Sequence, residues 1–313
     1  MSLRRIGITL GDVAGIGPEI VAKALASGKL DKRYRYEVIG DPGTTIRERA
    51  AHWVVAGAER CLRGDLAALV TGPIAKELLH QAGYPFVGQT ELLAHLSRTK
   101  KFAMLLTNDQ ATPHPNLLPQ GEKGRKLESG RSPLPLGGED QGEGAGVLRV
   151  ALVTTHAPIR DVPKLITGKK ICDVVALTAD FCRQLGIQKP RIAVTGLNPH
   201  AGEGGLLGTE ERRIIAPAVK RVHAIGPCPA DTVFYRAAHG EFDAVVAMYH
   251  DQGLAPFKLL AFDNGVNVTL GLPFVRTSPD HGTAPDIAGK GIARPDGMIA
   301  AINLAAKLVC RER

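Results

Sequence analysis

Short apolar runs alternate with longer amphipathic segments along most of this 313-residue chain. The runs are rich in Val, Ile, Leu and Ala and end at Gly, Pro or polar residues, which is typical of buried strands in a parallel or mixed sheet. They are RIGITL (5–10), YRYEVI (34–39), LAALVT (66–71), KFAMLLT (101–107), VLRVALVTT (147–155), RIAVT (191–195), FDAVVAM (242–248) and GVNVTL (265–270). The segments between them repeat apolar residues at helical spacing, most clearly at 169–186 and 297–310. Strands that alternate with helices predict an α/β fold with mostly parallel sheets.

The length of the chain predicts two domains. We expect residues 1–108 and 251–313 to form a first, discontinuous domain and residues 148–250 to form the second. Residues 110–147, between two predicted strands, are rich in Gly and Pro, contain no aromatic residue and show no periodicity. Such a segment cannot bury enough apolar surface to offset its ordering entropy, so we predict a disordered insertion in the place of a hairpin loop.

Three of the predicted strands are each followed closely by a histidine: His156, His200 and His250. A single histidine in such a place is more often a packed structural residue. Ligands in open α/β sheets bind beyond the carboxyl ends of strands, so three histidines in equivalent positions favour a shared site. Three imidazoles with open positions suit a catalytic divalent ion.

Two glycine-rich loops follow predicted strands. GDVAGIGPE (11–19) lacks the GxGxxG fingerprint, so a tight strand-to-helix turn is as good a reading as a phosphate cradle. NPHAGEGGLLGTEE (198–211) leads into a predicted helix over 208–226, with Thr209 as its expected N-cap and two Glu in its first turn. Backbone N–H groups there could face a cofactor phosphate, which makes candidates of Gly202, Gly204, Gly205 and Gly208.

Charged and amide side chains follow the last two predicted strands. HDQGLAPFK contributes Asp251 and Lys258, and the stretch from 265 to 286 contributes Asn267 and Arg276 together with Asp280 and His281. Arg binds phosphate or carboxylate in a bidentate manner, and Lys acts as a point charge or an acid/base. We therefore expect anion binding beside the histidines.

Composition narrows the class of partner. The formal charge is +8, but only 4% of residues are aromatic and no basic cluster is interleaved with them, so small anions are better expected partners than nucleic acid. The five scattered cysteines show no CxxC spacing, which favours reduced thiols in a cytoplasmic protein. No apolar run approaches the ~18 residues of a membrane span, and the apolar stretch at the N-terminus is too short for a signal peptide.

Eight motifs, in order along nearly the whole chain outside 110–147, closely resemble the 4-hydroxythreonine-4-phosphate dehydrogenase (PdxA) family. They are GDVAGIGPE, VTGPIAK, VGQTELLA, VALVTTHAPIRDVP, GLNPHAGEGG, PADTVF, MYHDQGLAPFK and GVNVTLGLPFVRTSPDHGTA. The fold of that family is similar to that of isocitrate and isopropylmalate dehydrogenases, so we expect the same fold here.

The resemblance implies oxidation of 4-phosphohydroxy-L-threonine at C3 by NAD or NADP, followed by decarboxylation to 3-amino-2-oxopropyl phosphate, in vitamin B6 synthesis. It implies one divalent ion (zinc, magnesium or cobalt) on the three histidines, in a site shared across a homodimer interface. The implied substrate contacts are Gln89, Thr90, Lys258, Asn267 and Arg276. The catalytic candidates are Asp231, Asp251 and Lys258, although Asp231 is equally well read as a helix cap or turn residue.

Three departures from the family pattern leave alternatives open. Gln89 stands where the family has a His before the Thr of GHTE, the insertion at 110–147 is foreign to the family, and the segment from 41 to 57 is shorter than usual. The alternatives are a family sister that oxidises another 4-phosphorylated hydroxy acid or a dihydrodiol, a metal-dependent hydrolase, and an inactive paralogue.

Overall fold

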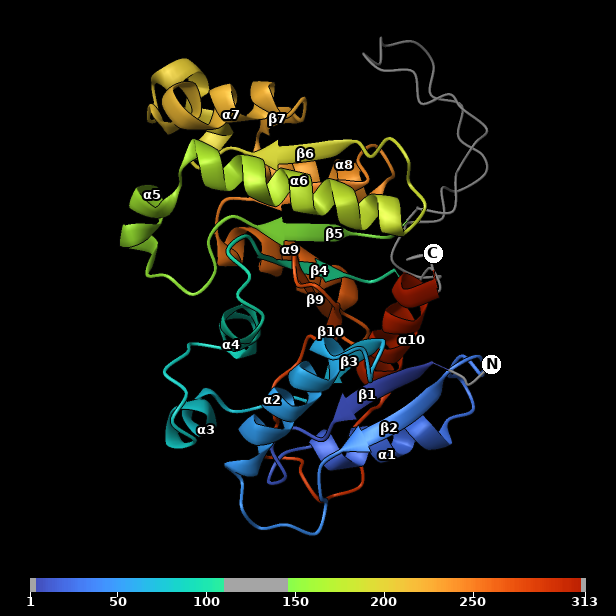
Figure 1. Ribbon diagram of the computed structural model, residues 1–313. Coiled ribbons are helices and arrows are strands. Elements are labelled where there is room, and N and C mark those ends of the chain that lie inside the picture. Colours follow the sequence, from blue (N-terminus) through green and yellow to red (C-terminus); the bar gives the residue numbers. More distant parts are fainter. Residues whose placement is uncertain (1–3, 110–145, 311–313) are drawn as a thin grey trace, which may run out of the picture.

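The computed structural model describes residues 4–109 and 146–310, whose strands form one ten-stranded sheet. The strands are β1 (Arg5–Thr9), β2 (Arg35–Ile39), β3 (Ala68–Thr71), β4 (Ala103–Thr107), β5 (Arg149–Leu152), β6 (Ile192–Thr195), β7 (Ile225–Cys228), β8 (Ala244–Ala247), β9 (Val266–Leu270) and β10 (Val275–Pro279). Their spatial order is β2-β1-β3-β10-β9-β4-β5-β8-β6-β7 (Figure 1).

Two parallel sets of strands meet in the middle of this sheet. β2, β1, β3 and β10 are parallel, and so are β5, β8, β6 and β7. β9 and β4 join the two sets through antiparallel pairs, including the β4–β5 pair. The sheet is therefore mostly parallel, as predicted, and its strand direction changes beside β9 and β4.

Helices cover both faces of the sheet. They are α1 (Gly17–Ala26), α2 (Arg49–Leu62), α3 (Lys76–Gln81), α4 (Gln89–Leu96), α5 (Val162–Leu165), α6 (Gly168–Gln184), α7 (Ala216–Arg221), α8 (Ala230–Ala238), α9 (His250–Ala261) and α10 (Asp296–Cys310). The short elements η1 (Ile159–Asp161), η2 (Pro199–Gly205) and η3 (Glu211–Ile215) lie between them. None of the helices in the described ranges is long and apolar enough to cross a bilayer.

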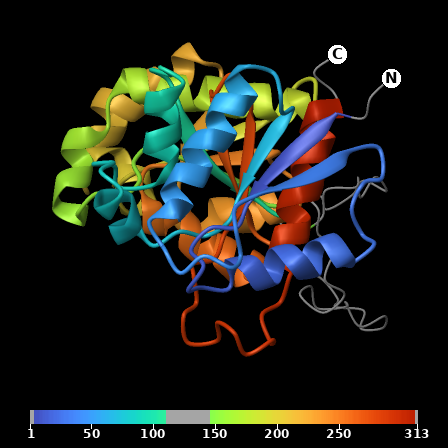
Figure 2. The ribbon, with the colours of Figure 1, turned by 60° about the horizontal axis from the view of Figure 1, so that its bottom comes forward.

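The strands bury side chains on both faces because their apolar residues are nearly continuous. On one face, α1, α6, α7 and α10 share the largest hydrophobic cluster, and α10 packs against β10, β3 and α1 (Figure 2). On the other face, α2, α3 and α4 cover the first set of strands, and α8 and α9 cover the second set. This three-layer arrangement leaves the middle of the second face, between α4 and α9, less completely covered by helices (Figure 1).

The α/β prediction and the eight predicted strands are confirmed, but β7 and β10 were not predicted. The strands of both predicted domains belong to one continuous sheet, so the division at 108, 148 and 250 stays a prediction. The predicted insertion lies outside the described residues except for its last two positions.

The predicted helix over 208–226 is shorter and irregular. A π-helical turn from Glu211 to Ile215 precedes α7, and the N-cap is Glu210 without a side-chain capping bond. The expected capping role of Thr209 is therefore wrong. Glu211 is instead drawn into the interior by the preceding loop.

The loop GDVAGIGPE forms a tight turn between β1 and α1. A Cβ atom on Gly17 would lie 1.9 Å from the carbonyl oxygen of Leu10, so only glycine fits there. Asp12 is buried and accepts hydrogen bonds from Arg47 Nε at 3.0 Å and from the backbone N–H of Ala14 at 3.0 Å. These contacts support the structural reading of this motif.

Candidate functional site

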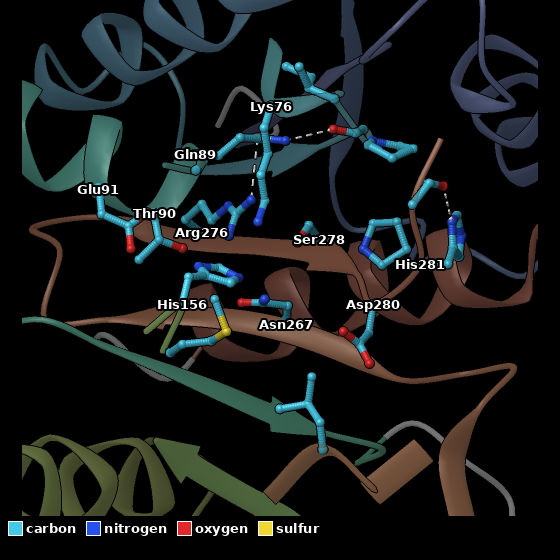
Figure 3. A pocket seen from close by; sticks show the side chains of 18 of the residues that line it. Lys76, Gln89, Thr90, Glu91, His156, Asn267, Arg276, Ser278, Asp280 and His281 are labelled. Carbon is cyan, nitrogen blue, oxygen red and sulfur yellow. Dashed lines mark hydrogen bonds between the residues drawn. The ribbon is translucent and has the colours of Figure 1, made fainter. Parts of the chain in front are cut away.

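A cavity of about 360 Å³ opens on the second face of the sheet, between α3 and α4 on one side and α9 on the other (Figure 3). It lies where the two sets of strands meet. Five of the residues expected to bind substrate line it, together with two of the three histidines: Gln89, Thr90, Lys258, Asn267, Arg276, His156 and His250. Segments far apart in the sequence thus converge on one hollow.

Arg276 provides a buried positive charge in this cavity. It lies on β10 with only 3% of its surface exposed, and its guanidinium donates hydrogen bonds to Thr71 Oγ1 at 2.6 Å and Thr269 Oγ1 at 3.0 Å. All its hydrogen-bond acceptors among the described residues are neutral, and Nε has no partner there. Burial lowers the pKa of Arg276 to about 10, which still leaves it cationic at neutral pH. A buried cation without a carboxylate partner is costly, so this site is built for an anion.

Gln89 and Thr90 begin α4 beside that guanidinium. Gln89 Oε1 accepts from Arg276 Nη2 at 3.3 Å, and Gln89 Nε2 donates to the carbonyl oxygen of Gly72 at 3.1 Å. Thr90 is 5% exposed, and its hydroxyl lies 3.4 Å from that of Thr269. Gln89 therefore contacts Arg276 directly and orients it.

Lys258 enters the cavity from α9. Its Nζ donates to the carbonyl oxygen of Asp280 at 2.9 Å and lies 3.2 Å from Asp280 Oδ2. Burial raises the pKa of Asp280, and the ammonium of Lys258 partly offsets this effect. On the floor of the cavity, Asn267 of β9 presents a buried Oδ1 without a partner among the described residues. The cavity thus offers a second cation and, among the described residues, an amide oxygen without a donor.

His156 and His250 lie side by side at one wall. β5 and β8 are parallel neighbours, so their carboxyl ends bring the two rings to a centroid separation of 5.5 Å. Burial lowers the pKa of His156, and the nearby ammonium of Lys76 lowers it further. His250 Nδ1 lies 2.7 Å from Asp251 Oδ1, which leaves Nε2 for another partner. The Asp251 side chain is 87% exposed, so its contact with the site is through His250.

His200 is exposed and lies outside the cavity lining. Its loop is strained, because φ is positive at six consecutive residues, 200–205, three of which are not glycine. No group of three His, Cys, Asp or Glu side chains in 4–109 and 146–310 is arranged to hold a metal. The geometry of one chain therefore supplies two histidines, and the role of the third stays a prediction.

Glu211 anchors the loop that carries His200. Its carboxylate is 5% exposed and accepts hydrogen bonds from the backbone N–H groups of Leu197 at 2.8 Å and Asn198 at 2.7 Å, and from Asn198 Nδ2 at 2.9 Å. Burial alone would raise the pKa of Glu211, but these bonds outweigh burial, and the pKa lies below its ordinary value. The loop is wrapped around a buried negative charge.

The remaining candidates also lie away from the cavity. Asp231 is an exposed residue in the first turn of α8. The four candidate glycines all have positive φ, and a Cβ on Gly202 would meet Glu211 Oε2 at 2.6 Å. Acidic neighbours of this kind do not favour phosphate. The cofactor-binding role of these glycines stays a prediction.

The cavity also contains Asp280 and His281, which the sequence singled out, and three polar residues that it did not: Lys76, Glu91 and Ser278. Lys76 follows β3 by a few residues, so the rule that drew attention to the histidines would have found it. Ser278, Asp280 and His281 lie on or just after β10, whose polar sequence concealed the strand.

Comparison with known proteins shows the family to which the chain belongs. The family model described as "Pyridoxal phosphate biosynthetic protein PdxA" matches residues 20–305. A 4-hydroxythreonine-4-phosphate dehydrogenase from Desulfosudis oleivorans is 39% identical, over 96% of this chain and 94% of its own length. A D-threonate 4-phosphate dehydrogenase from Salmonella typhimurium is 36% identical, over 98% of this chain and 100% of its own.

Solved structures show the same relationship. The crystal structure of 4-hydroxythreonine-4-phosphate dehydrogenase from Klebsiella pneumoniae has a TM-score of 0.74 and 36% identity, covering 98% of this chain and 99% of that one. An isocitrate dehydrogenase from Methylococcus capsulatus, 15% identical over 98% of this chain and 84% of its own, has a TM-score of 0.51, which confirms the expected likeness of fold. From its full-length sequence relatives and its fold, the chain belongs to the PdxA family.

Proposed function

We propose that the chain is an NAD(P)-dependent dehydrogenase that oxidises 4-phosphohydroxy-L-threonine at C3 and releases CO₂ to give 3-amino-2-oxopropyl phosphate, in pyridoxal phosphate biosynthesis. Support comes from its family membership and from full-length relatives named for this activity. The observation that carries the proposal is the buried guanidinium of Arg276, which forms no ion pair among residues 4–109 and 146–310, in a cavity of about 360 Å³ that two neighbouring histidines share.

The histidines fit a divalent ion. No described residue hydrogen-bonds to the ring of His156, whose lowered pKa favours the neutral form that metals require. Asp251 holds Nδ1 of His250 and so directs Nε2 outward, a common arrangement around metal-binding imidazoles. We propose that His200 of the partner subunit completes the set in a homodimer. Three imidazoles suit zinc or cobalt better than magnesium, which prefers oxygen ligands.

The chain's own residues would bind and orient the substrate. Arg276 and Lys258 would hold its two anionic groups, and the hydroxyl of Thr90 and the amide of Asn267 would contact its polar atoms. The carboxylate of Asp280, which lies in the cavity and is paired with Lys258, would take up the proton that leaves the C3 hydroxyl. When bound, the ion would polarise the oxygen at C3 and the nicotinamide would accept the hydride.

The test is NADH or NADPH formation from 4-phosphohydroxy-L-threonine, with metal analysis of the purified protein. We expect dinucleotide-dependent turnover that a chelator abolishes and that added zinc or cobalt restores. A metal-dependent hydrolase would release product without any dinucleotide. An inactive paralogue would remain a folded protein without turnover on any family substrate, and either result would refute the proposal.

A second candidate substrate is D-threonate 4-phosphate. Gln89 stands in place of the family histidine and contacts Arg276, and a relative named for this activity is 36% identical along its whole length. The two substrates share the phosphate and carboxylate but differ in the ammonium group. Comparing kcat/KM for the two compounds in the same assay distinguishes the two activities.

A further inference from the structure

Lys76 is an ammonium group in the cavity to which neither the family resemblance nor the motifs assigned a role. It is the first residue of α3 and follows the turn after β3. Figure 3 shows its side chain pointing into the cavity, toward Arg276 and His156. His156 lines the same cavity.

Lys76 differs in its contacts from the lysines that form ion pairs. The lysines that form ion pairs among the described residues are Lys23, Lys101, Lys164, Lys169 and Lys258. Lys76 forms no ion pair within the described ranges, although Glu91 also lines the cavity. The carboxylate of Glu91 lies beside Gly88, since Oε2 is 3.0 Å from the position that a Cβ on Gly88 would occupy. This oxygen has no hydrogen-bond partner among the described residues. Within the described ranges Lys76 and Arg276 form no ion pair with a carboxylate, although the charge of Glu91 partly offsets the lowering of the Arg276 pKa by burial.

Lys76 and Arg276 both face the cavity (Figure 3), so an anion bound there would be attracted by both charges. The guanidinium of Arg276 is held by the hydroxyls of Thr71 and Thr269, whereas Lys76 is exposed and forms no ion pair among the described residues. A fixed planar fork and a mobile point charge are complementary ways of binding a phosphate or carboxylate. The arrangement also compensates for Gln89, which cannot become cationic as a histidine would.

We propose that Lys76 is a further substrate-binding residue, which closes on the anionic group that Arg276 holds and so sets the affinity for phosphorylated substrate. The inference rests on the proposed function for the identity of the substrate. It assigns Lys76 to binding and not to the chemical step.

The test compares Lys76→Gln, Lys76→Arg and Lys189→Gln, the last being an exposed lysine outside the cavity lining. Steady-state assays give KM and kcat for 4-phosphohydroxy-L-threonine. A separate titration follows the rise in Tm with inorganic phosphate at constant ionic strength, which requires no turnover. Because Lys76 is exposed, all variants should fold as the wild type does.

We expect Lys76→Gln to raise KM about tenfold, equivalent to about 1.4 kcal/mol, with kcat within about twofold. It should need about tenfold more phosphate for the same rise in Tm. For Lys76→Arg, the KM and the phosphate concentration needed for that rise in Tm should stay within about threefold of the wild type. Lys189→Gln should match the wild type in both measurements. A Lys76→Gln variant that equals Lys189→Gln in both measurements overturns the inference, and so does a fall in kcat at unchanged KM. If the phosphate titration separates Lys76→Gln from the wild type while the wild type shows no turnover, the anion-binding role of Lys76 is supported and the proposed reaction is refuted.

Discussion

Glu211 offers the sharpest test of how the fold holds its third histidine. Three non-glycine residues of the loop, His200, Ala201 and Glu203, have left-handed backbone conformations that cost of order 1 kcal/mol each. The buried carboxylate of Glu211 supplies the bonds that offset this strain. Glu211→Gln keeps the size of the side chain and removes only the charge and one acceptor.

The magnitude follows from the bonds. Hydrogen bonds to charged groups contribute roughly 1.5–3 kcal/mol and neutral ones roughly 0.5–1.5, so the two backbone bonds from Leu197 and Asn198 each weaken by about 1 kcal/mol. The third bond, from Asn198 Nδ2, is lost in the variant because the amide NH₂ of the introduced glutamine faces the amide NH₂ of Asn198. Asn198 Nδ2 still keeps its bond to Glu210 Oε2 at 2.8 Å. We therefore expect the free energy of unfolding to fall by about 2–3 kcal/mol.

The pH dependence has a definite sign. The pKa of Glu211 is lower in the folded protein than in the unfolded chain, so its contribution is present above the unfolded value of about 4.3 and is lost as pH falls through the folded value. The difference between wild type and Glu211→Gln should be full at neutral pH and shrink below about pH 4.

Urea unfolding followed by circular dichroism and by fluorescence measures this difference, with Glu203→Gln as the control. Glu203 lies in the same loop but is exposed, so its variant should stay within about 0.5 kcal/mol of the wild type. If the proposed dimer forms and His200 binds the ion as proposed, Glu211→Gln should also weaken metal binding by about 10–100-fold, because the loop no longer orients His200. A stability within 0.5 kcal/mol of the wild type at neutral pH, or a difference that grows in acid, would refute the reasoning.

Three further predictions concern the site and the first turn. His250→Ala should lower metal affinity at least tenfold without unfolding the protein, whereas His52→Ala, at an exposed position outside the cavity, should keep its metal on elemental analysis. Arg276→Met should raise KM more than a hundredfold, yet leave the free energy of unfolding unchanged or up to about 2 kcal/mol higher, because a buried cation without an anion destabilises the fold; a clear loss of stability would contradict this. Gly17→Ala should lower that free energy by more than about 3 kcal/mol, since its Cβ would overlap the carbonyl oxygen of Leu10, and a loss below 1 kcal/mol in thermal unfolding would show that the turn can relax.

Local patterns were sufficient for most of the framework. β5, β6 and β8 come from mostly apolar runs, which are typical of strands covered on both faces. A histidine follows each run, and this shared position made the three histidines candidates. β7 and β10 were not predicted because neither sequence is a continuous apolar run. β7 is an exposed edge strand with Gly and Pro, and the polar sequence of β10 is buried because Arg276 faces a cavity and Thr277 donates to the carbonyl oxygen of Ala301.

The composition of the site depended on which strands became neighbours. His156 and His250 meet because β5 and β8 pair in parallel, and Arg276 reaches the same cavity because β10 lies between β3 and β9. His200 follows the next strand, β6, but a left-handed turn around Glu211 keeps it out of the cavity lining. Periodicity reports how each segment buries its own side chains. It carries no information on strand order, on loop handedness or on which buried charge lacks a partner, because these depend on contacts between residues far apart in the chain.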